Sequence, residues 1–302
     1  VLFNWSVDAN EWLNGDADLL KEASALSALD GLSPNSARKL VALSRDFCQQ
    51  LPDRYSCARA YGGYYFSPAQ AMTIDALRSS ITHDAQSTKL ATLIRAASSC
   101  AASPGHTAQP FSTADSALPY LSNAWQRNIG LRVENELKDI SLKFARTRGT
   151  ANKQDALIFS EKLTENDLAF IDPPYSDVQY SRFYHVLESI ATGRQGLVYG
   201  TGRYPPRSER PQSGFSKKTS SLEEFQALMM SVAASGAHAI VTFPAEVASN
   251  GLSGLIVEAV SAQFFRVEKR KVASTFSTLG GNAINRKARE RATELILYLV
   301  PR

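Results

Sequence analysis

The pattern of apolar residues changes near residue 150, and this change limits the folds open to the chain. Before it, Leu, Ala and Ile recur at helical spacing in long segments. After it, short apolar runs bounded by turn residues alternate with helical patterns, which is typical of an α/β sheet. The sequence therefore predicts a mainly helical region over residues 1–150 and an α/β region over residues 151–302.

Individual elements can be predicted from the same patterns. Residues 17–50 indicate a helical hairpin with the turn "GLSPNS", where Asn35 or Ser36 can cap the second helix. A further helix begins with Ser67 as N-cap and Pro68 at the first helical position. Other helices are expected over residues 87–102, 122–146, 181–192, 221–235 and 252–263. The predicted strands are "DLAFID", "AHAIVTF", "FFRVEKRKVA" and "ATELILYLV".

Bulk composition excludes several classes of protein. No uninterrupted apolar run approaches the roughly 20 residues that a membrane span requires, and no secretion signal opens the sequence. We therefore expect a cytoplasmic protein with no membrane partner. Cys48, Cys57 and Cys100 are odd in number and form no CxxC, so neither a disulfide framework nor a metal site is predicted.

The distribution of charge permits a polyanionic partner. The net charge is +4, and residues 194–218 contain six Arg and Lys against a single acid, Glu209. The segment "NRKARER", residues 285–291, is similarly basic. Either stretch can lie along phosphates or can be a solvated basic loop, and the sequence leaves both readings open.

The segment "AFIDPPYSDVQY" carries the most specific chemistry. Asp172 ends an apolar strand, and Pro173 and Pro174 fix the backbone beyond it. Because proline has no amide donor, the turn presents carboxylate and carbonyl oxygens together, which suits a target NH2 group. Tyr175 can stack on a base that has been extruded from a duplex. The alternative is a structural Pro-Pro turn with tyrosines packed at the surface.

This pattern resembles the amino-methyltransferases that use S-adenosylmethionine, and within them the D12-type DNA adenine-N6 methylases. The resemblance covers roughly residues 60–302 and rests on Asp172, Pro173, Pro174 and Tyr175. It extends to the segments "YFSPAQAMTIDALRSSI", "SPGHTAQPF", "YSRFYHVLESIA" and "STLGGNAINRKARERATELILYLV". It implies a Rossmann-like sheet, S-adenosylmethionine as cofactor and single- or double-stranded DNA as substrate.

The resemblance also implies roles for individual residues. Asp172 and the Pro173 carbonyl would hold the target amine, Tyr175 would stack on the base, and Asp155 would contact the adenine of the cofactor. Asp155 is alternatively a helix cap, and His185 is alternatively a structural helix residue. The candidate DNA-contacting residues are Tyr180, Arg182, His185, Arg203, Arg207, Lys217 and Lys218.

One element of such a methylase is not found. A glycine-rich turn of the form FxGxG should follow a strand and open a helix, because the backbone approaches the cofactor closely there. The segments "AYGGYYF", "YGTGR" and "LGGNA" do not have this context. The chain is therefore a piece of a larger enzyme, a degenerate DNA-binding methylase or one subunit of a split methylase, and the intact Asp172–Tyr175 motif favours a split enzyme whose partner supplies the turn.

The resemblance implies methyl transfer to adenine N6 in DNA, and it leaves the biological role open among restriction-modification, phage-borne protection and defence. Cytosine N4 in DNA and an RNA base are competing targets, because the Asp-Pro-Pro-Tyr core serves any exocyclic amine. A nucleic-acid-binding subunit without catalysis is the alternative from a different functional class.

Overall fold

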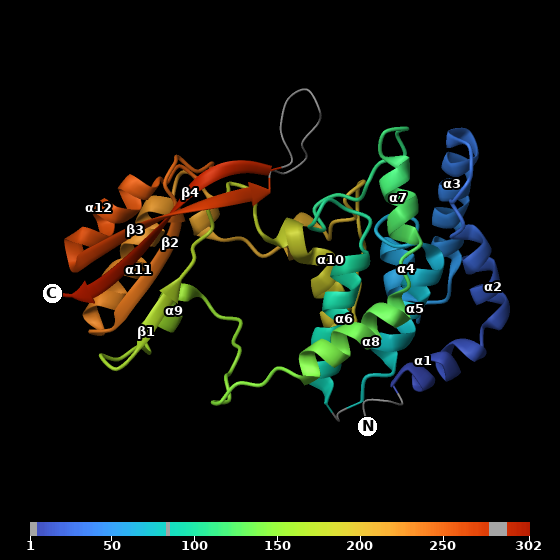
Figure 1. Cartoon of the computed structure of the whole chain (residues 1–302), viewed down its shortest axis with the longest axis horizontal. Coiled ribbons are helices and arrows are strands. Elements are labelled where there is room, and N and C mark those ends of the chain that lie inside the picture. Colours follow the sequence, from blue (N-terminus) through green and yellow to red (C-terminus); the bar gives the residue numbers. More distant parts are fainter. Residues whose placement is uncertain (1–4, 83–84, 278–288) are drawn as a thin grey trace. The chain divides into compact units, whose positions relative to one another are not determined.

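The computed structural model describes residues 5–82, 85–277 and 289–302 and divides into two compact units (Figure 1). The helical unit comprises Val1–Thr147 and Ser181–Arg210, and the sheet unit comprises Arg148–Tyr180 and Pro211–Arg302. The division near residue 147 lies close to the expected one. Residues 181–210, however, belong to the helical unit, so the predicted continuous region over 151–302 is interrupted.

The described residues of the helical unit form a large hydrophobic core and a smaller separate cluster around Val41, Leu121 and Trp125. Its helices are α1 (Trp5–Asn14), α2 (Ala17–Leu26), α3 (Pro34–Gln50), α4 (Ser56–Tyr61), α5 (Pro68–Ser79), α6 (Gln86–Cys100), α7 (Leu118–Trp125), α8 (Ile129–Ser141) and α10 (Ser181–Thr192), with a short 3₁₀ turn, η1, at Arg207–Glu209. Val186 and Ile190 of α10 are buried in the core formed mainly by the first half of the chain. This packing explains why residues 181–210 lie with the helical unit.

Local caps define several of these helices. Ser67 and Gln70 form the capping box of α5, which confirms the predicted N-cap. The predicted caps of α3 were wrong: Ser33 accepts a hydrogen bond from the amide of Ser36, and Pro34 occupies the first turn, where an amide donor is not required. The single helix predicted over residues 122–146 is two helices, because Asn128 caps a new helix at Ile129.

The sheet unit contains all four predicted strands. Its elements are α9 (Ala156–Ser160), β1 (Leu168–Ile171), η2 (Gly214–Ser216), α11 (Ser221–Ala234), β2 (His238–Pro244), α12 (Gly254–Phe264), β3 (Phe265–Ser277) and β4 (Arg289–Pro301). The strand order is β1-β2-β4-β3, with β1 parallel to β2 and the other pairs antiparallel. The result is a sheet of mixed parallel and antiparallel strands with β1 at one edge (Figure 1).

The two faces of the sheet differ in how they are covered. Helices α11 and α12 pack against each other and against β2, and they bury Ala239, Val241 and Phe243. The opposite face carries Leu168 and Phe170 of β1, whose residues are 58% and 68% exposed. A parallel pair of strands is usually covered on both faces, so this apolar face is unusual.

The described residues include no helix with both the length and the apolar character needed to cross a membrane.

Candidate functional site

The site is built on the turn that follows β1. Because β1 and β2 are parallel and Ile171 pairs with Val241, their carboxyl ends bring Asp172 and Thr242 together at one edge of the sheet. The hydroxyl of Thr242 donates to Oδ1 of Asp172 at 3.0 Å. This hydrogen bond holds the Asp172 carboxylate in one orientation. Because Asp172 is exposed, the carboxylate remains accessible.

The proline turn is held by a buried amide. Asn250 is fully buried, and its Nδ2 donates to the carbonyls of Pro174, at 2.7 Å, and Phe215, at 2.9 Å. Within the described residues the Pro173 carbonyl accepts no hydrogen bond. The turn therefore exposes the Asp172 carboxylate and anchors Pro174, whereas Pro173 is buried, so contact of its carbonyl with an amine stays a prediction.

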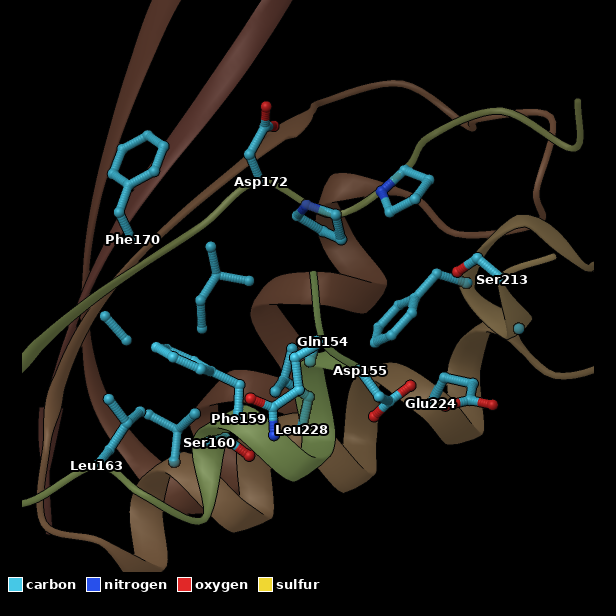
Figure 2. Close-up of a pocket in the computed structure, with 18 of the residues that line it drawn as sticks. Gln154, Asp155, Phe159, Ser160, Leu163, Phe170, Asp172, Ser213, Glu224 and Leu228 are labelled. Carbon is cyan, nitrogen blue, oxygen red and sulfur yellow. The ribbon is translucent and has the colours of Figure 1, made fainter. Parts of the chain in front are cut away.

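A cavity of about 920 Å³ runs along β1 and reaches this turn. Figure 2 shows Asp155, Ser213 and Glu224 toward one end and Phe159 and Leu163 toward the other. The lining thus combines polar acceptors with apolar surface, which is typical of small-molecule sites.

Asp155 lies in the cavity wall and also caps a helix. Its Oδ1 accepts from the amides of Leu157, at 2.9 Å, and Ile158, at 3.3 Å, at the start of α9. The capping alternative is therefore observed. Contact between Asp155 and the adenine of a cofactor stays a prediction, and its position in the wall is compatible with it.

The glycine segments do not complete the cavity. Gly63 follows α4, and Gly200 and Gly202 lie in a turn closed by pairing of Tyr199 with Tyr204, all in the helical unit. The segment "LGGNA" falls in residues 278–288, outside the described part of the chain. The cavity residues therefore fit part of S-adenosylmethionine, with acceptors and apolar surface, while a glycine turn of the form FxGxG after a strand is absent from the described residues.

The candidate DNA-contacting residues fall on both units. Lys217 and Lys218 are exposed after η2 in the sheet unit, which also contains Tyr180. Arg182, Arg203 and Arg207 belong to the helical unit. Residues 285–288 of the basic segment "NRKARER" lie outside the described residues.

His185 does not suit a DNA contact. The residue is 4% exposed, its Nε2 lies 2.8 Å from the carbonyl of Gly202, and its Nδ1 lies 3.1 Å from the carbonyl of Arg182. Burial lowers the pKa of His185 despite these two carbonyls, which favours the neutral imidazole. The structure therefore supports the structural alternative for His185, because a phosphate cannot reach a ring enclosed in this way.

Residues 63–238 match the family model for D12 class N6 adenine-specific DNA methyltransferases. The matched segment is more than half of the chain and contains the whole turn from Asp172 to Tyr175. The chain belongs to this family. A "Modification methylase LlaI" of Lactococcus lactis subsp. lactis is 38% identical over 98 residues, which cover 32% of this chain and 15% of that protein. No solved structure matches the chain significantly.

Two residues of this candidate site escaped sequence reasoning. Thr242 lies 70 residues from Asp172, and only the parallel pairing of "DLAFID" with "AHAIVTF" would have placed them together. Asn250 lies in the turn segment "ASNGLSG", where nothing in the sequence distinguishes an anchoring amide from an ordinary turn residue.

Proposed function

We propose that this chain carries the target-amine site of a DNA methyltransferase that transfers a methyl group from S-adenosylmethionine to adenine N6. The observation that carries the proposal is the Asp172 carboxylate, oriented by Thr242 at the carboxyl end of β1 beside an anchored proline turn. Family membership supports DNA as substrate and adenine N6 as the target atom.

The chemistry needs acceptors more than a strong base. The lone pair of an exocyclic amine is delocalised into the base, and two acceptors on its hydrogens favour a nitrogen that can attack. Asp172 and the Pro173 carbonyl would supply these acceptors, and Tyr175, which is 37% exposed, would stack on the extruded base. S-adenosylmethionine would supply the electrophilic methyl group and leave as S-adenosylhomocysteine when its sulfur–methyl bond breaks, and the methylated amine would lose one proton to solvent. Positioning would therefore account for most of the rate enhancement.

The cofactor would occupy the cavity along β1. Asp155 at the polar end would accept a hydrogen bond from the adenine of the cofactor. Phe159, toward the other end, would offer the cofactor an apolar surface. The parallel β1–β2 pair with its site at the carboxyl ends supports a Rossmann-like arrangement. Since DNA is the proposed substrate, we expect the protein to act in the cytoplasm.

We also propose that a second polypeptide supplies the glycine-rich turn. Two observations support it: that turn is missing from the described residues, and the apolar residues Leu168 and Phe170, which line the cavity along β1, are largely exposed. The name of the lactococcal relative, a modification methylase, supports a role in restriction-modification.

The test is transfer of a tritiated methyl group to unmethylated duplex DNA, single-stranded DNA and RNA. The chain would be assayed alone and mixed with the product of the neighbouring reading frame, and the labelled nucleoside would be identified after digestion. We expect N6-methyladenine from DNA, and at least about a hundredfold less from Asp172→Asn, which replaces an acceptor oxygen by a donor.

Other products would redirect the assignment. N4-methylcytosine or labelled RNA would identify one of the competing amine targets. DNA binding by a mixture that transfers no methyl group to any substrate would contradict the enzyme and support the non-catalytic binding subunit.

A further inference from the structure

Two arginines from distant parts of the sequence meet at one tyrosine ring in the helical unit. The guanidinium carbons of Arg45, on α3, and Arg203, in the turn of residues 199–204, lie 4.2 and 4.7 Å from the centroid of the Tyr64 ring. Each is anchored through Nε: Arg45 donates to the carbonyl of Gly63 at 2.9 Å, and Arg203 to that of Ala60 at 2.7 Å. Both side chains are thus held in place through Nε, and their terminal nitrogens remain for another acceptor.

No carboxylate balances these two charges within the described residues, since neither arginine forms an ion pair there. By contrast, Arg38 pairs with Asp115 elsewhere in the same unit. Burial lowers the pKa of Arg45, and the charge of Arg203 lowers it further while Tyr64 opposes the shift. Two cations held at one ring repel each other, and a bound anion would remove that cost.

A second pair of arginines lies over Tyr204, the residue that follows Arg203 in the sequence. Arg182 and Arg210 lie over the ring of Tyr204, with guanidinium carbons 4.9 and 5.0 Å from its centroid. Arg210 is anchored in the same manner, because its Nε donates to the carbonyl of Pro205 at 2.8 Å. The arginine cluster is defined as Arg45, Arg182, Arg203 and Arg210.

We propose that the arginine cluster binds phosphates of the DNA backbone, with Arg45 and Arg203 as its principal contacts. The proposal rests on DNA being the substrate of the proposed function. A guanidinium presents a planar fork that matches two phosphate oxygens, and a fork already fixed by a ring and a carbonyl loses little conformational entropy on binding. Two separate pairs of cations match a repeating anion, such as successive phosphates, better than they match one free phosphate.

The experiment measures the salt dependence of binding to a short fluorescent duplex by anisotropy. It uses the full chain, with the partner product present if the mixture is the active form. Each phosphate contact contributes about 0.9 to the slope of log Kobs against log salt. We expect Arg45→Gln and Arg203→Gln each to reduce the slope by about that amount, and Arg45→Lys, which keeps the charge, to retain it.

Arg38→Gln is the matched control, because it removes an arginine that is already paired with Asp115. Unchanged slopes in folded Arg45→Gln and Arg203→Gln variants would overturn the proposal, as would loss of slope in the Arg38→Gln control or a wild-type protein that does not bind duplex at low salt. Tight binding of inorganic phosphate, lost in both variants without a change of DNA slope, would assign the cluster to a free anion instead.

Failure of the cluster and failure of the proposed function are distinguishable. Methyl transfer with unchanged slopes in the variants would contradict DNA binding by the arginine cluster and would still support the methyltransferase. Reduced slopes in a protein that transfers no methyl group would keep the cluster as a DNA-binding surface and count against the enzyme.

Discussion

Thr242 shows how a single hydroxyl can orient the proposed acceptor. It donates to one oxygen of Asp172 at 3.0 Å and so leaves the second oxygen for the target amine. We predict that Thr242→Val lowers kcat about tenfold, because the carboxylate then rotates away from its productive orientation. Affinity for duplex DNA should stay within about twofold, since Thr242 lies at the acceptor and makes no DNA contact in the proposed function.

Steady-state kinetics with a separate DNA titration would check this prediction. Thr242→Ser, which keeps the hydroxyl, should recover most of the activity. A loss of DNA affinity equal to the loss of kcat, or no recovery in the serine variant, would contradict a positioning role.

At the residue scale, what the sequence could predict depended on distance along the chain. The acceptors in Asp172–Tyr175 are consecutive, so their chemistry follows from residue type and order. Thr242 and Asn250 act on the same turn from 70 and 76 residues away, and only the strand pairing and the folded loop bring them there. His185 was a candidate DNA contact by residue type, but residues far along the chain bury it, and this burial could not be predicted from its local sequence.

At the element scale, the helix α4 depends on a carboxylate supplied by a neighbouring helix. Oδ1 and Oδ2 of Asp75, on α5, accept from the amides of Cys57 and Ala58 at 2.9 Å each, at the first turn of α4. Burial raises the pKa of Asp75 to about 7, although these hydrogen bonds oppose the shift. The capping box of α5 is local and could be predicted, whereas this cap between helices could not.

The raised pKa of Asp75 has a definite sign for stability. The folded state binds a proton between the unfolded pKa of 3.8 and about 7 that the unfolded state does not bind. The contribution of Asp75 is therefore full below pH 4 and is lost as pH rises toward 7. We predict that wild-type protein loses about 2 to 3 kcal/mol of unfolding free energy from this group between pH 5 and pH 8.

Asp75→Asn should flatten this dependence, because the amide does not ionise. Urea unfolding of the helical signal at pH 5, 6, 7 and 8 would measure it, with exposed Asp46→Asn as the matched control. Parallel profiles for wild type and Asp75→Asn would show that Asp75 stays ionised across this range and functions only as a cap.

At the scale of the whole molecule, helix positions could be predicted but their assignment to a unit could not. The apolar periodicity of residues 181–192 correctly predicts a helix, which the structure has as α10. Periodicity shows that a helix buries one face, but it does not show against which core. Val186 and Ile190 pack with the helical unit, so a chain that looked like two successive regions crosses between its units more than once.

The uncovered face of the sheet yields the last prediction, which concerns the proposed partner. If the partner covers Leu168 and Phe170, Phe170→Ser should weaken its binding roughly ten- to a hundredfold, because burying a phenylalanine contributes about 1.5 to 3 kcal/mol. Leu255→Ser is the matched control, since Leu255 is 75% exposed and lies on α12, one of the helices on the opposite, covered face.

Isothermal titration would measure partner binding and then the binding of S-adenosylmethionine to each mixture. We expect the chain alone to bind the cofactor weakly, the wild-type mixture to bind it tightly, and the Phe170→Ser mixture to require more partner for the same effect. Equal cofactor affinity with and without the partner would contradict the split enzyme, because the cavity along β1 would then be sufficient. Equal loss of partner affinity in the Leu255→Ser control would instead place the partner elsewhere, since a partner on the β1 face has no reason to sense α12.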